Sequence, residues 1–355
     1  MTRASSIIER AGLGQGEAII LSKPSNIFYV SGYTGEGIAL LADGLCAIVT
    51  DFRYTEQVTR QAPAFAVCQI KTGQSHAALA AEVLSGRGIH AVRYEADEVT
   101  VARFEKMQAD MPGFTFAPLC GEPEKVRRIK EPAEIDCMRK ACDISCKALE
   151  NILPRIKPGV SEIDIRIDLE FEMLRLGADG LAFSTIVASG VNGSLPHAIP
   201  GGRKIEKGDM VTMDFGAKYG GYCADMTRTV SVGEPNAEMK KIYGIVLKAQ
   251  QEAQDALHAG LVASDVDKIA RGIITAEGYG GCFGHGLGHS VGIDIHEDPR
   301  LSPICHDVLE PMTTMTVEPG IYVPGLGGVR IENTCVIGEN ASETLVYAPK
   351  ELLIL

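Results

Sequence analysis

The feature that most constrains the fold is an internal repeat that occupies the chain from about residue 125 onward. Apolar side chains recur at helical spacing in two segments, one starting at Ile135 and the other at Met239. Each of these predicted helices is followed by a second helix that opens with a Ser-x-x-Asp sequence, which is typical of a capped N-terminus. The two caps are predicted at Ser161 and Ser264, which lie 103 residues apart. The pattern predicts two similar halves that each begin with a helix pair.

Two predicted β-hairpins continue the repeat. In each half a strand ends in an acidic residue and a glycine-containing turn, at 213–216 and at 317–320. The returning strands start at Asp225 and Glu332, so the offsets between the halves are 104 and 107 residues. Because order and spacing agree with those of the helix caps, we expect an α+β domain in which two halves, each helix, helix and hairpin, fold around a pseudo-two-fold axis.

Each hairpin carries two acidic residues: Asp214 and Asp225 in the first, Glu318 and Glu332 in the second. If the hairpins turn after Tyr219 and at Gly325, the members of each pair lie directly opposite each other across the strands. Four carboxylates would then converge on the axis. Their repulsion would drive them to take up protons unless cations compensate the charge. Two divalent ions supply a matching charge, so the pattern predicts a dinuclear metal site.

A glycine-rich segment at 284–292 adds imidazoles to this set. It carries His285 and His289, and His296 follows shortly after. Two histidines four residues apart could form a helical zinc-binding pair, but the surrounding glycines oppose a helix and no His-Glu-x-x-His sequence is present. Oxygen ligands with one imidazole and no thiolate suit Mn²⁺, Co²⁺, Fe²⁺, Zn²⁺ or Mg²⁺, and the sequence leaves these alternatives open.

The first third of the chain shows a different pattern. Short apolar strands, at 18–21, 38–41 and 46–49, alternate with helix-like stretches such as 75–84. This alternation predicts an α/β domain. Pro123 and Pro132 bracket a basic run at 125–130, which indicates a linker that enters a long helix. We therefore expect a smaller amino-terminal domain at 1–124 and a larger domain at 125–355.

Composition narrows the class of protein. The 355 residues carry a formal net charge of −12, which argues against the basic surface that a nucleic-acid partner requires. Ten cysteines without a Cys-x-x-Cys pair indicate a reduced protein. The first residues include no apolar stretch of signal-peptide length, and the apolar run at 37–49 is broken by Asp43. We expect a cytoplasmic protein with no membrane partner.

The residues described so far resemble the pita-bread metallopeptidases, the family that includes methionine aminopeptidase, Xaa-Pro aminopeptidase and prolidase. In that family the metal ligands occur in the order Asp, Asp, His, Glu, Glu, and the matching positions are Asp214, Asp225, His289, Glu318 and Glu332. The sequences at 31–34 and 51–54 resemble the creatinase-like amino-terminal domain of the proline-directed branch, and 130–139 resembles the start of its catalytic domain. Methionine aminopeptidases usually lack that first domain. The resemblance therefore implies the Xaa-Pro aminopeptidase or prolidase branch.

The resemblance also implies roles for individual residues. Glu318 matches the family's proton-shuttling ligand, which is also a general base. His197 and His296 match imidazoles that face the substrate and would steady the oxyanion or the leaving nitrogen. His285 and Arg330 match positions in the substrate pocket, and Arg330 could also balance the charge of the carboxylates.

The implied reaction is hydrolysis of the bond before proline in dipeptides or at the amino terminus of short peptides. Two divalent ions would assist it, with manganese or cobalt ahead of zinc or iron, and the implied assembly is a homodimer. Three questions stay open: whether the enzyme is a dipeptidase or an aminopeptidase, whether it hydrolyses another small amide on the same fold, and whether it only binds ligands without catalysis.

Overall fold

A computed structural model describes residues 2–355. The chain divides into two compact units, and the division falls between Arg127 and Arg128. The basic run at 125–130 begins inside a short helix, α6 (Glu122–Arg127), rather than in an extended linker. No helix within residues 2–355 combines the length and the apolar character needed to cross a membrane.

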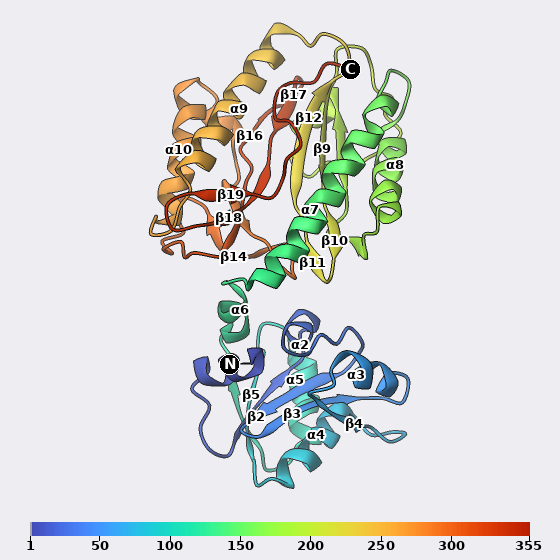
Figure 1. Ribbon diagram of the computed structural model, residues 1–355, viewed down its shortest axis with the longest axis vertical. Coiled ribbons are helices and arrows are strands. Elements are labelled where there is room, and N and C mark those ends of the chain that lie inside the picture. The colour runs from blue at the N-terminus through green and yellow to red at the C-terminus, as the bar shows by residue number, and fades with distance from the viewer. Residues whose placement is uncertain (1) are drawn as a thin grey trace. The chain divides into compact units, whose positions relative to one another are not determined.

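The amino-terminal unit is an α/β domain with one six-stranded sheet in the order β4-β3-β2-β1-β5-β6 (Figure 1). Its strands are β1 (Glu17–Leu21), β2 (Ile38–Ala42), β3 (Leu45–Thr50), β4 (Ala66–Gln69), β5 (Ala91–Tyr94) and β6 (Thr115–Pro118). Its other helices are α1 (Arg3–Arg10), α2 (Pro24–Ser31), α3 (Thr55–Gln61), α4 (His76–Ser85) and α5 (Val101–Asp110). Only β2 runs antiparallel to its neighbours. The predicted α/β pattern, including the three strands and the helix at 75–84, is confirmed.

The carboxy-terminal unit contains four long helices and several small sheets. The helices are α7 (Pro132–Ile152), α8 (Glu162–Arg175), α9 (Ala237–Ala256) and α10 (Ala263–Ala276). The strands of the first half are β7 (Gly180–Leu181), β8 (Ile186–Ser189), β9 (Met210–Phe215), β10 (Ala217–Tyr219), β11 (Tyr222–Cys223) and β12 (Met226–Ser231). Those of the second half are β13 (Gly288–Ser290), β14 (Glu297–Leu301), β15 (Thr314–Val317), β16 (Gly320–Val323), β17 (Gly327–Arg330), β18 (Asn333–Ile337) and β19 (Ser342–Thr344).

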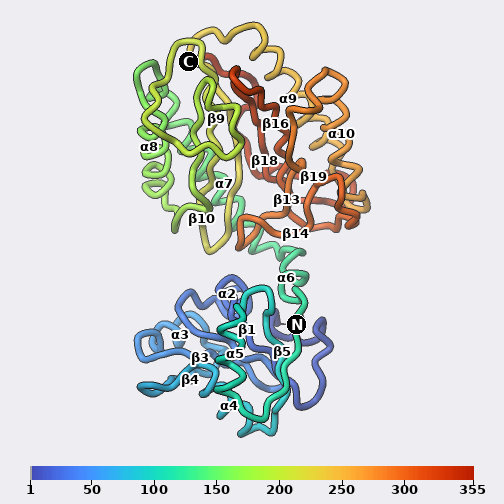
Figure 2. Tube along the Cα trace, turned by 180° about the vertical axis from the view of Figure 1, so that it is seen from behind, coloured from blue at the N-terminus to red at the C-terminus, as the bar shows by residue number. Residues whose placement is uncertain are grey.

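The two halves of this unit repeat one arrangement, as predicted. Figure 1 shows α7 and α8 beside one group of strands and α9 and α10 beside the other, and Figure 2 shows the strands from behind. Strand β17 of the second half contacts β9 and β12 of the first, so the halves meet through their hairpins. Apolar side chains of α9 and α10, such as Val246 and Ile274, pack with Ile331 in one buried core. The helices therefore cover the hairpins and leave the acidic residues between the halves.

The register of the first hairpin differs from the prediction. Asp214 lies opposite Thr227, whereas the sequence analysis placed it opposite Asp225. The reason is the turn, in which Gly220 and Gly221 both adopt positive φ angles of 58° and 83°, as a two-residue type I′ turn requires. The turn is therefore centred one residue later than expected, and every pairing shifts by two. Because side chains alternate with a period of two, Asp225 keeps the face it shares with Asp214.

The second hairpin has the predicted register. Val317 pairs with Asn333 on one side of the acidic residues, and Gly320 pairs with Arg330 on the other. The same register continued between them places Glu318 opposite Glu332, with the turn at Gly325, whose φ is 77°. This hairpin therefore aims its two carboxylates at the same point.

One of the two predicted helix caps is wrong. Ser161 caps α8 and forms a capping box with Asp164, as expected. In contrast, α10 begins before Ser264, and its N-cap residue Val262 makes no side-chain hydrogen bond. The acidic residue of that sequence, Asp267, instead pairs with Arg271 at 2.7 Å and accepts a hydrogen bond from a backbone N–H of the glycine-rich segment. Asp267 thus bonds to a residue one turn along its own helix and to a neighbouring segment, and it does not cap α10.

Candidate metal centre and catalytic cavity

Four carboxylates converge where the two hairpins interrupt their strand pairing. Asp225 lies between β11 and β12, Glu318 between β15 and β16, and Glu332 between β17 and β18, while Asp214 is the penultimate residue of β9. An interruption bends a strand and re-aims its side chains. Carboxylate oxygens of Asp214, Asp225 and Glu332 lie within 4.8 Å of one another. We call these four residues together the carboxylate cluster.

His289 completes the group from β13. Its Nε2 atom lies 3.5 Å from a carboxylate oxygen of Asp225 and 3.4 Å from one of Glu318. The segment can approach this closely only because it contains glycine: a Cβ atom on Gly288 would lie 2.0 Å from the carbonyl oxygen of Thr316. Thr316 also links the two elements, since its hydroxyl accepts from the backbone N–H of His289 at 3.0 Å and donates to Glu318 at 3.1 Å. The segment is a strand at this point, so the predicted absence of a helical histidine pair is confirmed.

The tautomer of His289 tests whether cations fit between these groups. Its Nδ1 atom lies 3.0 Å from the carbonyl oxygen of Ser290, which can only accept, so Nδ1 carries the proton. The Nε2 lone pair of the neutral ring then faces two carboxylate oxygens, an arrangement that is repulsive unless a cation or a carboxyl proton lies between them. Metal-binding histidines show this pattern of one nitrogen on a backbone carbonyl. In addition, Oδ1 of Asp214 is buried without a hydrogen-bond partner among the described residues. The residues therefore fit a site for divalent cations.

Burial sets the charge states of the cluster. Burial first, and then the neighbouring carboxylates, raise the pKa of Asp225 and of Glu332 well above their ordinary values. Burial also raises the pKa of Glu318 to about 7. The same burial lowers the pKa of His289 to about 4, so the imidazole is neutral near pH 7. Crowded carboxylates beside a neutral imidazole are the electrostatic condition under which cations bind most favourably.

Arg330 places a buried positive charge directly against the carboxylates of the cluster. Its guanidinium donates to Oδ2 of Asp214 at 2.5 Å and to the hydroxyl of Thr227 at 3.1 Å, and its side chain is 4% exposed. Burial alone would lower the pKa of Arg330, but Tyr322 and Asp214 raise it well above its ordinary value. The structure thus shows the charge-balancing contact that the sequence analysis allowed for Arg330.

Tyr322 connects Arg330 to His285, and the sequence analysis missed it. The tyrosine hydroxyl accepts from Arg330 at 2.9 Å and lies 2.9 Å from Nε2 of His285. Because Nδ1 of His285 faces the carbonyl oxygen of Gly286 at 2.8 Å, Nε2 is the acceptor and Tyr322 the donor. Burial lowers the pKa of His285 to about 4, which keeps the ring neutral. No local sequence signal marks Tyr322, because its role depends on two partners distant in sequence.

A cavity of about 410 Å³ opens onto the carboxylate cluster. All nine predicted site residues line it: Asp214, Asp225, His289, Glu318, Glu332, His197, His285, His296 and Arg330. His197 and His296 are exposed, and the ring of His296 lies 4.5 Å from that of His289. The cavity also has an apolar part, which includes Phe183 and Ile186, and a cationic side chain, Arg300. Its size and mixed lining suit a small polar ligand with an apolar portion.

A buried ion pair supports the segment that carries His289 and His296. Lys130, just before α7, lies 2.9 Å from Oε2 of Glu297, and the two side chains are 1% and 9% exposed. The same ammonium lies 3.4 Å from the hydroxyl of Ser290, the residue after His289. Lys130 therefore holds both ends of the segment. In the sequence, Lys130 stands at the predicted start of a domain, and no local pattern predicts that it pairs with a residue 167 positions away.

Known proteins resemble this chain over nearly its whole length. Metallopeptidase family M24 matches residues 136–339, and the Creatinase/Prolidase N-terminal domain matches residues 2–129. The Xaa-Pro dipeptidase of Pyrococcus horikoshii is 34% identical over 99% of this chain and 98% of its own length. A solved Xaa-Pro dipeptidase from Bacillus anthracis is 40% identical, with a TM-score of 0.94 over 99% of this chain and 98% of that one. An X-Pro aminopeptidase from Thermotoga maritima is 34% identical, with a TM-score of 0.92 over 98% of this chain and 100% of that one. The chain therefore belongs to metallopeptidase family M24, with a pita-bread domain after a creatinase-type amino-terminal domain, and it is a hydrolase.

Proposed function

We propose that the chain is a dinuclear metal-dependent peptidase that hydrolyses the Xaa-Pro bond, and that dipeptides are its preferred substrates. The observation that carries the proposal is the position of His289, whose Nε2 lone pair faces Asp225 and Glu318 at 3.5 and 3.4 Å. Four carboxylates match the charge of two divalent cations. The names of the relatives, which are Xaa-Pro dipeptidases and an X-Pro aminopeptidase, support the choice of substrate.

The five residues Asp214, Asp225, His289, Glu318 and Glu332 would hold the metal ions. When bound, such ions polarise a carbonyl group and lower the pKa of water. Manganese or cobalt suits the oxygen-rich ligand set, and zinc or iron would also be accepted. Within residues 2–355 none of the ten cysteines forms a disulfide, which supports the further proposal of a reducing, cytoplasmic location.

The side chains around the cluster would carry out the steps of the reaction. Glu318, held through one oxygen by Thr316, would take up the proton of the attacking water and pass it to the leaving nitrogen. His197 and His296, which line the same cavity as the cluster, would donate hydrogen bonds to the developing oxyanion. Arg330 would keep Asp214 oriented through the contact at 2.5 Å.

Arg300 favours a dipeptide over a longer peptide. Its side chain lines the cavity, is 55% exposed, and has one ion-pair contact among the described residues, to Asp298 at 3.9 Å. A guanidinium in this state can bind a carboxylate. In a dipeptide the carboxylate follows the proline directly, within a cavity of about 410 Å³. In a longer peptide an uncharged amide takes that place.

The test compares Ala-Pro, Ala-Pro-Ala and Ala-Ala-Ala as substrates of metal-stripped protein before and after addition of Mn²⁺ or Co²⁺. We expect metal-dependent cleavage before proline, with Ala-Pro cleaved faster than Ala-Pro-Ala. Glu318→Gln should lower kcat by at least about 100-fold, as expected for loss of a general base. Arg300→Gln should raise the KM for Ala-Pro about tenfold and change that for Ala-Pro-Ala little.

Glu343→Gln is the matched control, because this glutamate is 59% exposed and does not line the cavity. It should behave like the unmodified protein. Two bound metal ions per chain without cleavage of any of the three peptides would overturn the proposed substrate, and cleavage that persists in Glu318→Gln would overturn the proposed role of that residue.

A further inference from the structure

A second cavity, of about 720 Å³, lies within the amino-terminal unit. Its walls come from segments that follow the carboxyl ends of β1, β3, β4 and β5, together with the start of β2. These ends share one edge of the sheet, because the four strands are parallel to one another and β2 is antiparallel. The cavity therefore lies along the carboxyl edge of a parallel sheet. We call it the edge crevice.

The edge crevice includes the point where the chain reverses its direction across the sheet. After β1 the chain continues through α2 to β2 on one side, and after β5 it continues through α5 to β6 on the other. Strands β1 and β5 are neighbours, so the loops that follow them diverge. In open α/β sheets, ligands bind at such switch points, outside the carboxyl ends of the strands. Ser22 after β1 and Glu98 after β5 both line the crevice.

Buried hydrogen bonds connect the two loops at the switch point. Glu95, which directly follows β5 and is 1% exposed, accepts hydrogen bonds from the backbone N–H of Ser22, from that of Lys23 at 2.7 Å and from the side chain of Asn26 at 2.6 Å. These contacts tie the two diverging loops together. The loop after β1 is therefore held against the end of β5 by buried hydrogen bonds, so this part of the crevice wall is preformed, as is usual for ligand sites.

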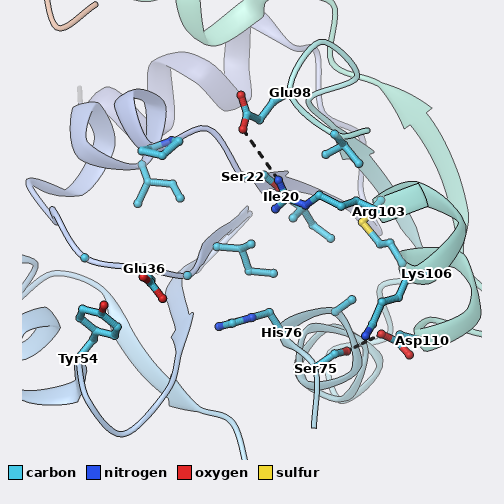
Figure 3. A pocket seen from close by; sticks show the side chains of 18 of the residues that line it. Ile20, Ser22, Glu36, Tyr54, Ser75, His76, Glu98, Arg103, Lys106 and Asp110 are labelled. Atoms are coloured by element: carbon cyan, nitrogen blue, oxygen red, sulfur yellow. Dashed lines mark hydrogen bonds and ion pairs between the residues drawn. The ribbon is translucent and has the colours of Figure 1, made fainter. Parts of the chain in front are cut away.

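The polar residues of the crevice separate by charge. Figure 3 shows Arg103 and Lys106 entering from one side and Glu36 from the other, with His76 between them. Arg103 contacts Glu98 only at 3.9 Å, and Lys106 has no hydrogen bond or ion pair within residues 2–355. Glu36 lies 3.2 Å from Arg53 but both side chains are more than half exposed. Both signs of charge are thus available to a ligand.

The remaining lining decides the class of ligand. Apolar side chains form the centre of the crevice: Ile20, Ile27, Ile38, Val99 and Met107. The carboxylates in the lining outnumber the cationic side chains, and this excess of negative charge disfavours a polyanion such as a nucleotide. The carboxylates are those of Glu36, Glu98 and Asp110, and the cations are Arg103 and Lys106. A molecule with one carboxylate, one ammonium group and an apolar body matches all parts of the lining.

We propose that the edge crevice binds a small zwitterion, namely a free amino acid or short peptide with both ends unblocked. The ligand's carboxylate pairs with Arg103 and Lys106, its ammonium group faces Glu36, and its side chain lies on the apolar centre formed around Ile20 and Ile38. This site uses none of the residues of the catalytic cavity. The proposal does not depend on the substrate proposed above.

The test is hydrogen–deuterium exchange measured by mass spectrometry on the full chain carrying Glu318→Gln, with Leu-Leu as the zwitterionic probe. N-acetyl-leucinamide, which has the same side chain and no charge, is the paired control ligand. At concentrations up to about 10 mM, which detect weak sites, Leu-Leu should slow exchange at 75–78 and 98–107. N-acetyl-leucinamide should leave these segments unchanged.

Variants on α5 test the charge contacts. Arg103→Glu and Lys106→Glu should each weaken the response at 75–78 and 98–107 about tenfold in apparent Kd. Arg60→Glu is the matched control, because this arginine is 76% exposed on α3 and does not line the crevice. Protection confined to residues 128–355, an equal response to both ligands, or an unchanged response in both α5 variants would overturn the proposal. Failure of peptide hydrolysis would not affect this result, so the two proposals can fail separately.

Discussion

The buried ion pair between Lys130 and Glu297 leads to a prediction that the structure makes quantitative. The two charged groups are 2.9 Å apart, with side chains 1% and 9% exposed. Replacing Lys130 with Met leaves the carboxylate of Glu297 buried without its cation, which costs about 3 to 5 kcal/mol in such pairs. For a domain the size of the carboxy-terminal unit, this corresponds to a fall in melting temperature of roughly 6 to 20 °C.

A double-mutant cycle measured by scanning calorimetry checks the origin of this loss. The double variant Lys130→Met/Glu297→Leu removes both charges, so it should be more stable than the sum of the single variants predicts, by about 2 kcal/mol or more. Lys204→Met is the control, because this lysine is 60% exposed and lies 3.7 Å from Asp164. Its effect should be below about 1 kcal/mol. If the two single effects add within about 0.5 kcal/mol, the ion pair is not what stabilises the segment.

Four further predictions follow from single features. Burial raises the pKa of Glu95 to about 7 from an ordinary value of 4.5, so the folded chain binds this proton more tightly than the unfolded chain. The stability gained from this proton is fully present below about pH 4.5 and is lost as the pH rises through about 7. The amino-terminal unit should therefore melt at a lower temperature at about pH 8 than at about pH 5, and Glu95→Gln should flatten this pH dependence in calorimetric scans. Gly288→Ala should displace His289, because its Cβ would lie 2.0 Å from a Thr316 oxygen. Activity assays should then show loss of peptide hydrolysis and metal titrations loss of metal binding, and a normal metal content would contradict this prediction. Tyr322→Phe removes the donor to His285 and should lower kcat/KM about tenfold in peptidase assays, and an unchanged kcat/KM would contradict this role. Removing metal with a chelator should lower the melting temperature of the carboxy-terminal unit by several degrees, because the carboxylate cluster is left uncompensated, and an unchanged temperature would argue against a resident metal.

The local sequence was sufficient to predict the structure wherever the contacting residues are close along the chain. The second hairpin is an example, since Gly325 marks its turn and the alternation of side chains then sets the pairing of Glu318 with Glu332. The first hairpin shows the limit of this reasoning. Two adjacent glycines allow more than one centre for the turn, and the centre chosen from the sequence was one residue too early, so Asp214 was predicted opposite Asp225 and lies opposite Thr227. The shared face survived the error because the shift was even.

The sequence by itself determined that two similar halves would bring four carboxylates to one place, because periodicity, turn residues and order are properties of short segments. The assignment of His289 to the same group rested on the resemblance to a known family. Only the tertiary structure decided which charges meet. The contact of Arg330 with Asp214 joins residues 116 positions apart, and that of Lys130 with Glu297 joins residues 167 apart. The edge crevice likewise depends on which strands of the amino-terminal sheet are neighbours. Packing brings such groups together, and no local pattern encodes packing between segments so distant in sequence.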